Sequence, residues 1–278
     1  MNTAQIKDTT QNAKAEAKSW VVALARCGYA AKGIVYLLIG VLALQAALGP
    51  GGKTTDSTGA LHTIAGQPFG KILLGLVGIG LCGYALWRLV QAALDPENKG
   101  TDAKGIATRI GYVFSGLAYG ALALTAFHII SGSTGGNGSS RQDWTAQLMA
   151  APLGRWLVGL VGLGFFGAAL YAFYVAYSAK FRDKLKLGEM SSTEETWITR
   201  LGRFGYAARG VVFAITGWFF IRAALNANPS ETGGLDKALQ TLAHQPYGLW
   251  LLGLVALGVA AYGIYVLAQA RYRRIYIS

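Results

Sequence analysis

Long runs without a charged residue constrain the fold of this chain more than any other feature of its sequence. Residues 33–52, 110–140, 156–179 and 249–270 contain no Asp, Glu, Lys or Arg. Two further apolar runs, 72–87 and 211–221, are closed by Arg88 and Arg222, which can snorkel from a helix end to the lipid headgroups. The hydrocarbon core of a bilayer is about 30 Å thick and takes roughly 20 helical residues to cross. The sequence therefore predicts six transmembrane helices.

Composition agrees with this class of protein. Of the 278 residues, 53% are hydrophobic and only 14% are charged, which excludes an ordinary soluble domain. The two cysteines, Cys27 and Cys82, lie inside or at the ends of apolar helices. We expect them to be small buried side chains and not a structural disulfide.

Two short motifs recur three times in the same order, which indicates a tandem repeat. The first motif has the form Arg-x-Gly-Tyr-x-x-Lys/Arg-Gly and begins at Arg26, Arg109 and Arg203. The second has the form Pro-x-Gly-x-x-Leu-x-Gly and begins at Pro68, Pro152 and Pro246. Each unit is expected to contain a first helix, a polar loop with a short helical piece, and a second helix with the Pro in its first turn.

The predicted fold is an all-α membrane protein with three tandem two-helix repeats in a pseudo-threefold bundle. The spans are expected near residues 23–48, 69–94, 108–131, 153–179, 203–225 and 247–272. The chain divides into a polar cytoplasmic segment (1–22), repeat 1 (23–97), repeat 2 (98–182), and repeat 3 with a short basic tail (183–278). Glycine and alanine lie on two faces of each second helix, which predicts neighbours on both sides and a closed ring.

The basic residues predict the orientation of the chain. Nineteen of the 25 Lys and Arg residues fall on the side that holds both termini, and acidic residues divide nine to four between the same two sides. Because basic loops stay in the cytoplasm, both termini should face it. The cytoplasmic side then carries +10 (19 − 9) of the net charge of +12, as a fringe that contacts anionic lipid, and no nucleic-acid partner is expected.

One stripe of residues recurs on the first helix of all three units when the helix is drawn at 100° per residue. Its polar and aromatic members are Arg26, Tyr29 and Tyr36; Arg109, Tyr112 and Tyr119; and Arg203, Tyr206 and Phe213. One interpretation is close helix packing, in which small residues let backbones approach. The other is a lining around the pseudo-threefold axis, with an anion-attracting mouth at its cytoplasmic end.

The densest basic segment contains Lys180, Arg182, Lys184 and Lys186, which are candidates for contact with lipid or a protein partner. No nucleophile elbow, P-loop, HExxH or paired-carboxylate motif is visible, so no catalytic residue, cofactor or metal site is predicted. Two functions stay open: a non-catalytic membrane module that contacts anionic lipid or a partner, and a channel or carrier for a small or anionic solute along the axis.

From about residue 23 to residue 271, the two repeated motifs make the chain resemble the bacterial membrane family named domain of unknown function 1206. That family likewise consists of three copies of a two-helix region. The second copy in this chain departs from the pattern at Ser115, where the others have Lys32 and Arg209. The resemblance implies a bacterial inner-membrane location. It carries no established activity, and therefore no site residue.

Overall fold

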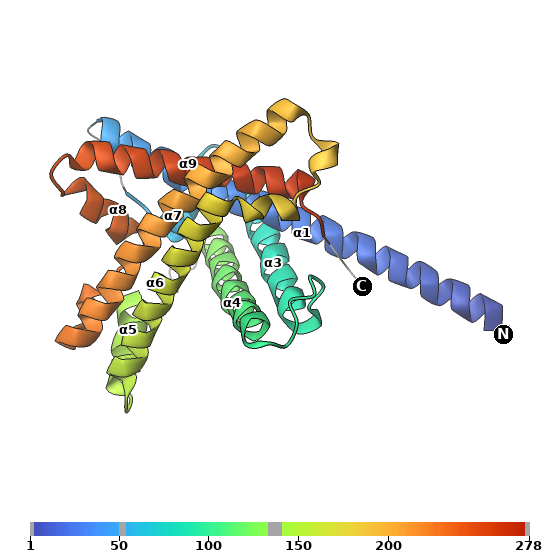
Figure 1. Cartoon of the computed structure of the whole chain (residues 1–278), viewed down its shortest axis with the longest axis horizontal. Helices are drawn as coiled ribbons and strands as arrows, with labels where there is room; N and C mark the ends of the chain where they lie inside the picture. The colour runs from blue at the N-terminus through green and yellow to red at the C-terminus, as the bar shows by residue number, and fades with distance from the viewer. Residues whose placement is uncertain (1–2, 50–53, 133–140, 276–278) are drawn as a thin grey trace.

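The structure, a computed structural model, describes residues 3–49, 54–132 and 141–275, and it is dominated by long helices (Figure 1). Six of them are long and apolar enough to cross a membrane. They are α1 (Thr3–Leu48, apolar over Trp20–Leu48), α3 (Gly70–Leu94), α4 (Ala103–Ser131), α6 (Gly154–Ser178), α7 (Ser192–Asn226) and α9 (Gly248–Tyr272). The prediction of six spans is confirmed.

Two spans begin earlier than predicted because polar caps start their helices outside the apolar stretch. Asp102 accepts a hydrogen bond from the Gly105 amide at the start of α4. Ser191 and Glu194 form a reciprocal capping box at the start of α7. Hydropathy detects only the apolar part of such a helix, whereas the cap fixes where the helix begins.

Short helices separate the two spans of each repeat, as predicted. They are α2 (Ser57–Ala65), α5 (Arg141–Ala150) and α8 (Leu235–Ala243), and a 3-10 turn, η3 (Pro229–Glu231), precedes α8. We call this side of the molecule the short-helix side. The opposite side carries the loop 95–102 and the 3-10 turns η1 (Lys180–Lys184) and η2 (Leu187–Glu189), and we call it the linker side.

The Pro-x-Gly motif forms a tight turn before the second helix, so the prediction that the Pro lies in the first helical turn is wrong. In repeat 1, the Gly70 amide donates to the Gln67 carbonyl oxygen at 2.8 Å, which places Pro68 and Phe69 at the centre of the turn. Phe69 has φ of 58°, and its counterparts Leu153 and Tyr247 have 62° and 60°. A Cβ on Gly70 would lie 2.4 Å from the Ile64 carbonyl oxygen, so only glycine fits against the end of α2.

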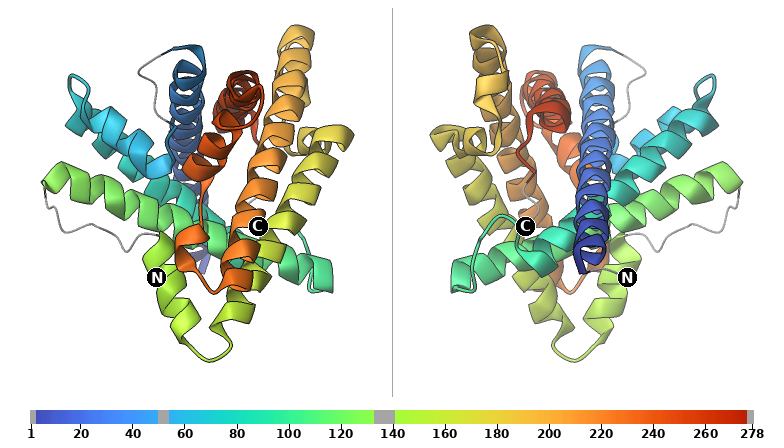
Figure 2. Two further views of the ribbon diagram at one scale, coloured as in Figure 1. Left: turned by 90° about the vertical axis from the view of Figure 1, so that its left-hand side faces the viewer. Right: turned by 90° about the vertical axis from the view of Figure 1, so that its right-hand side faces the viewer.

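The spans form a row in which the second helix of each repeat packs on the first helix of another. α3 packs on α4, α6 on α7, and α9 on α1. The helices α1 and α9 lie between the α3–α4 pair and the α6–α7 pair (Figure 2). Glycines permit these close approaches: an added Cβ on Gly40 of α1 would lie 2.4 Å from the Ala260 amide nitrogen of α9.

The prediction of a closed ring is wrong, because the arrangement of the six spans is open between the two helices of repeat 2. α1 packs on α3 in repeat 1, and α7 packs on α9 in repeat 3. In the described part of the chain, α4 and α6 scarcely touch. Phe114 of α4 occupies the position that Ala31 and Ala208 have in the other repeats, and a side chain of this size keeps helix backbones apart.

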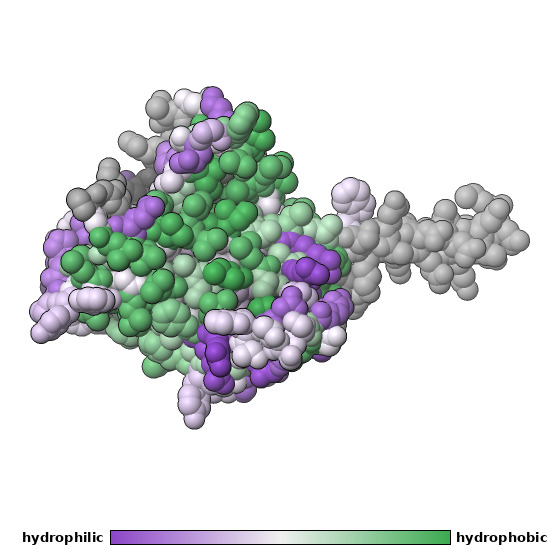
Figure 3. Space-filling view, turned by 90° about the horizontal axis from the view of Figure 1, so that it is seen from above, coloured by the Kyte–Doolittle hydropathy of each residue, from purple (hydrophilic) through white to green (hydrophobic). Residues whose placement is uncertain are grey.

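The surface has a broad apolar area bordered by hydrophilic residues (Figure 3). Large exposed side chains include Trp156 and Trp250, near the short-helix ends of α6 and α9, where an interfacial aromatic belt is expected.

Both cysteines are free. Cys82 is half-buried, but Cys27 is exposed, so its predicted burial is wrong.

Candidate functional site

The residues of the stripe on the first helices have different surroundings: two of its tyrosines contact each other inside the bundle, whereas two of its arginines are exposed. Tyr36 and Tyr119 meet at the centre, with their hydroxyl oxygens 3.4 Å apart. Arg109 donates to the carbonyl oxygens of Ala92 and Ala93 at the end of α3. Arg26 and Arg203 lie exposed on α1 and α7. A mouth formed by these three arginines stays a prediction.

Lys32 of α1 lies at the centre of an aromatic cage and is only 5% exposed. Its Nζ donates to the Tyr84 hydroxyl oxygen at 2.8 Å. The same Nζ lies 4.6 Å from the ring centroid of Tyr84 and 5.1 Å from that of Tyr119. The rings of Tyr36 and Tyr262 complete the cage, each 5.8 Å away. Cation–π attraction stabilises the ammonium group here, and no Asp or Glu of the described residues forms a salt bridge with it.

Arg209 of α7 occupies the equivalent position in repeat 3 and has a similar environment. Its Nη1 donates to the Tyr262 hydroxyl oxygen at 2.7 Å. Its guanidinium carbon lies 4.4 Å from the Tyr262 ring centroid and 4.8 Å from that of Phe213. The buried Nε of Arg209 has no hydrogen-bond partner among the residues that the structure describes. Each of these two cations thus bridges the two helices of its own repeat through a tyrosine hydroxyl group.

The two cations lie close together without a carboxylate. Lys32 and Arg209 are 5.8 Å and 4.4 Å from the Tyr262 centroid, which puts them within about 10 Å of each other and makes their charges repel. Among the described residues, no Asp or Glu forms a salt bridge with either. A buried charge without a counter-charge is costly. The surroundings of Lys32 and Arg209 therefore carry an excess of positive charge among the described residues.

Arg88 belongs to the same cluster, and the prediction that it snorkels to the headgroups is wrong. Its Nε donates to the Tyr84 hydroxyl oxygen at 2.8 Å, and its Nη1 donates to Gln91 at 3.0 Å. Its guanidinium carbon lies 4.9 Å from the ring centroid of Tyr112. The buried hydroxyl and amide groups of α3 supply acceptors inside the bundle, so this side chain turns inward.

A cavity of about 440 Å³ adjoins Arg209 and extends toward the short-helix side. Tyr36, Tyr119 and Phe213, which hold the same stripe position in the three repeats, all line it. Thr125 and Thr216 add hydroxyl groups, Asp56 adds a carboxylate as the N-cap of α2, and the remaining lining comes mainly from α4, α7 and the starts of α2 and α8. Cavities of this size accommodate small molecules. In the described part of the chain, no group of His, Cys, Asp or Glu is placed to hold a metal ion.

The linker side has a second cation cluster, which does contain a carboxylate. Glu97 accepts hydrogen bonds from Arg273 and Gln91, both at 2.7 Å, and from Tyr112 at 3.2 Å. Lys184 and Lys99 form ion pairs with it at 3.6 Å and 3.5 Å. Arg273 and Leu185 also form an antiparallel bridge. We call this group the Glu97 clasp, because it ties both linkers to the end of α9.

Electrostatics in the Glu97 clasp stabilise the ionised carboxylate. Burial alone would raise the pKa of Glu97, but the charges of Arg273, Lys184 and Lys99 outweigh it and lower the pKa to about 2. Burial, with repulsion from Arg273, lowers the pKa of Lys184 to about 8. The acid is therefore ionised at neutral pH and compensates the buried Arg273.

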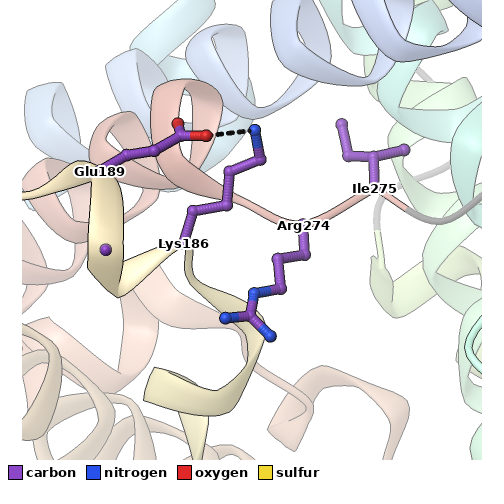
Figure 4. A pocket seen from close by; sticks show the side chains of 5 residues that line it. Lys186, Glu189, Arg274 and Ile275 are labelled. Carbon is purple, nitrogen blue, oxygen red and sulfur yellow. Dashed lines mark hydrogen bonds and ion pairs between the residues drawn. The ribbon is translucent and has the colours of Figure 1, made fainter.

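The basic segment at 180–186 is engaged largely by the protein itself. Arg182 pairs with Glu195, Lys184 with Glu97, and Lys186 with Glu189. The ammonium group of Lys180 lies over the ring of Tyr174. A shallow depression of about 440 Å³ lies beside Lys186, Glu189 and Arg274, and Figure 4 shows the Lys186–Glu189 pair at its edge. Contact of this segment with lipid stays a prediction.

The sequence analysis did not select the two cations and the two tyrosines that bind them, namely Lys32, Tyr84, Arg209 and Tyr262. A comparison of the three repeats does contain a signal for these contacts. Lys32 and Arg209 are equivalent in repeats 1 and 3, and so are Tyr84 and Tyr262. Repeat 2 has Ser115 and the small residue Ala168 at the same two positions. Cation and tyrosine are thus present together or absent together, a pattern that indicates contact between them.

The fold and this centre define an integral membrane protein built from three two-helix repeats. A family model described as Domain of Unknown Function (DUF1206) matches residues 27–95, 110–179 and 204–273, one segment in each repeat. The chain is also 38% identical over 260 residues to "Uncharacterized protein YxxB" of Bacillus subtilis (strain 168), with 94% of each chain covered. No solved structure gives a significant match. The chain belongs to the DUF1206 family, as its motifs predicted.

Proposed function

We propose that this protein is a non-catalytic membrane module that binds an anion between its repeats, at the centre formed by Lys32 and Arg209. One observation carries the proposal: two buried cations lie within about 10 Å of each other, with tyrosine hydroxyls as partners, and neither forms a salt bridge with a described Asp or Glu. An anion in the adjoining cavity would reach Arg209 and reduce the repulsion between the two charges.

Binding is favoured over passage of a solute along the axis. On the linker side of the cavity, the aromatic cage of Lys32 occupies the middle of the bundle, and the Glu97 clasp joins the helix ends beyond it. A solute would have to displace both. The cavity itself adjoins Arg209 from the opposite side, which suits a ligand that enters and leaves by one route.

The location proposed for this module is the bacterial inner membrane, with both termini in the cytoplasm. The linker side then faces the cytoplasm, as the excess of basic residues favours. On this side, Lys180, Arg182, Lys184 and Lys186 are proposed to contact anionic headgroups or a partner protein, in addition to their internal pairs.

Thermal unfolding of the purified full-length chain in a neutral detergent tests the anion site. Inorganic phosphate should raise the unfolding temperature of the wild type, relative to an equal ionic strength of gluconate. Arg209→Gln should weaken the apparent phosphate affinity at least tenfold. Arg203→Gln, which removes an exposed cation from the same helix, is the matched control and should leave the affinity unchanged. Equal phosphate responses in all three proteins would contradict the proposal.

A further inference from the structure

We propose that the anion is the head group of an amphiphile, such as a membrane lipid with one phosphate, whose apolar chain lies between α4 and α6. This proposal rests on the function proposed above and names the class of ligand. The head group would occupy the cavity at Arg209, and the chain would extend sideways into the bilayer through repeat 2.

The glycines of the second helices show where the bundle opens. In repeat 1, an added Cβ on Gly80 would lie 2.6 Å from the Ala31 Cβ of α1. In repeat 3, one on Gly258 would lie 2.4 Å from the Ala208 Cβ of α7. The equivalent residue of repeat 2, Gly164, has no atom within 4 Å of such a Cβ. The face of α6 that should pack on α4 is therefore uncovered.

The facing surface of α4 is uncovered as well. An added Cβ on Gly28 of α1 would lie 2.6 Å from the Tyr84 Cα, and one on Gly205 of α7 would lie 2.6 Å from the Tyr262 Cα. Their equivalent on α4, Gly111, has nothing within 4 Å. Phe114, one turn further along, is 68% exposed. Two matched helix faces in one repeat thus lack the partners that they have in the other two.

Three residues of repeat 2 explain why this opening exists. Phe114 is too large for the close contact that Ala31 and Ala208 make with a facing glycine. Ser115 replaces the cation, and Ala168 replaces the tyrosine that would bind it. Repeat 2 therefore lacks both the small side chain and the cation–tyrosine bond that join α1 to α3 and α7 to α9.

The uncovered faces adjoin the cavity. Ala118, on the same side of α4 as Phe114 and one turn away, lines the cavity, and Phe165, next to Gly164, lines it from α6. Arg209 and Thr216 form part of the wall contributed by α7. The path from the bilayer to Arg209 is thus apolar at its entrance and cationic at its end, which matches the two parts of an anionic amphiphile.

Charge favours a lipid-like occupant over a second copy of this chain. A helix inserted between α4 and α6 would have to bring a carboxylate to the depth of Arg209 to compensate it. The apolar helices of this chain contain four acidic residues, and all of them precede the apolar stretch of their helix: Asp8 and Glu16 in the N-terminal part of α1, and Glu194 and Glu195 in the first turn of α7. A single anionic head group on an apolar chain meets both requirements.

Native mass spectrometry of the full-length chain tests the inference with two lipids that share their chains. The detergent-purified protein is equilibrated with dioleoylphosphatidic acid or with dioleoylphosphatidylcholine, and retained lipid is counted. We expect at least tenfold preferential retention of the phosphatidic acid by the wild type and loss of this preference in Arg209→Gln. Gly164→Leu with Gly167→Leu, which narrows the opening, should reduce retention tenfold without changing the response to inorganic phosphate. Leu170→Trp, on an exposed outer face of α6, should retain lipid as the wild type does.

The outcomes separate this inference from the proposed function. Phosphate stabilisation that depends on Arg209, without preferential retention of the phosphatidic acid, overturns the inference and leaves the anion site standing. Retention that is equal in the narrowed variant and the wild type also overturns it. A stable dimer joined through α4 and α6 would identify a second copy as the occupant and overturn it. Absence of both phosphate and lipid binding would remove the proposed function itself.

Discussion

Repeats 1 and 3 are closed, whereas repeat 2 is open, although all three share the same order of helices and motifs. In the closed repeats, Lys32 binds Tyr84 and Arg209 binds Tyr262 across the two helices. Glycines at the same contact let the backbones approach. Repeat 2 keeps its glycines, but Ser115 and Ala168 replace the bonded pair.

A small number of side chains therefore decides whether the two helices of a repeat pack together or leave an opening between them. The contacts between successive repeats hold α4 against α3 and α6 against α7, so the bundle stays together without a contact between α4 and α6. Arg209, the cation that joins the two helices of repeat 3, then borders a cavity on the side that repeat 2 leaves open. A structural cation thereby becomes available to a ligand.

The largest effect on stability is expected when Tyr84 of repeat 1 is replaced by alanine, the residue that repeat 2 has at the equivalent position 168. Tyr84→Ala removes a fully buried ring, the hydroxyl acceptor for Lys32 and Arg88, and an edge contact to Tyr119 at 4.6 Å. We expect a loss of about 3–5 kcal/mol in the free energy of unfolding, measured by denaturant titration in mixed micelles. Tyr171→Ala, at an exposed site on α6, should cost less than about 0.5 kcal/mol. Equal losses in the two variants would show that the cage does not hold repeat 1 together.

The residues that follow the second helices differ between repeats 1 and 2, and this difference should make the stability of the protein depend on pH. Repeat 1 is followed by the ionised Glu97, and repeat 2 has the buried, apolar Phe181 at the aligned position. Because the folded pKa of Glu97 is about 2 and the usual value is 4.5, its contribution is complete above about pH 4.5 and is lost as pH falls toward 2. Glu97→Gln should cost about 2–3 kcal/mol at neutral pH and flatten this part of the stability profile.

Glu189→Gln is the control for that profile, since its pair with Lys186 is exposed and should contribute nothing measurable. An unfolding temperature that falls equally between pH 4.5 and 2 in the wild type and in Glu97→Gln would show that other carboxylates are responsible. The Glu97 clasp would then not anchor the linker side.

Matched alanines in the second helices should give the smallest effects, with different signs. Gly80→Ala places a methyl group 2.6 Å from the Ala31 Cβ, and we expect it to cost about 1–3 kcal/mol of unfolding free energy. Gly164→Ala meets nothing within 4 Å, so it should be neutral or gain up to about 1 kcal/mol from helix propensity. Thermal unfolding in detergent measures both. A matching loss in Gly164→Ala would indicate that α4 covers this glycine.

The sequence predicted the number of spans, the repeats and the short helices, because each depends on local hydropathy or on recurrence along the chain. It failed where a contact depends on three-dimensional fit. The two small-residue faces of α6 look identical to those of α3, and the size of Phe114 on a different helix decides whether one of them is covered. The Pro-x-Gly turn was misplaced because positive φ at Phe69 leaves no compositional signal.

The candidate site was partly predictable. The aromatic members of the stripe were selected, and Tyr36, Tyr119 and Phe213 do line one cavity. The functional interpretation of the stripe rested on its arginines, whereas the buried cations are Lys32 and Arg209, which lie less than two turns further along α1 and α7. Their acceptors, Tyr84 and Tyr262, are more than 50 residues away in the sequence, so the hydrogen bonds can be recognised only in the folded structure.

Cysteine cross-linking at matched positions tests the central claim, that repeat 2 is open, most directly. In a background with Cys27→Ser and Cys82→Ser, one pair is Leu24→Cys with Gly83→Cys, where a Cβ on Gly83 lies 3.0 Å from Leu24 Cγ. The equivalent pair in repeat 2 is Ala107→Cys with Gly167→Cys, where Gly167 has no neighbour within 4 Å. We predict that a short thiol cross-linker joins the first pair and leaves the second unjoined in membranes. Equally rapid cross-linking of both pairs would contradict the account.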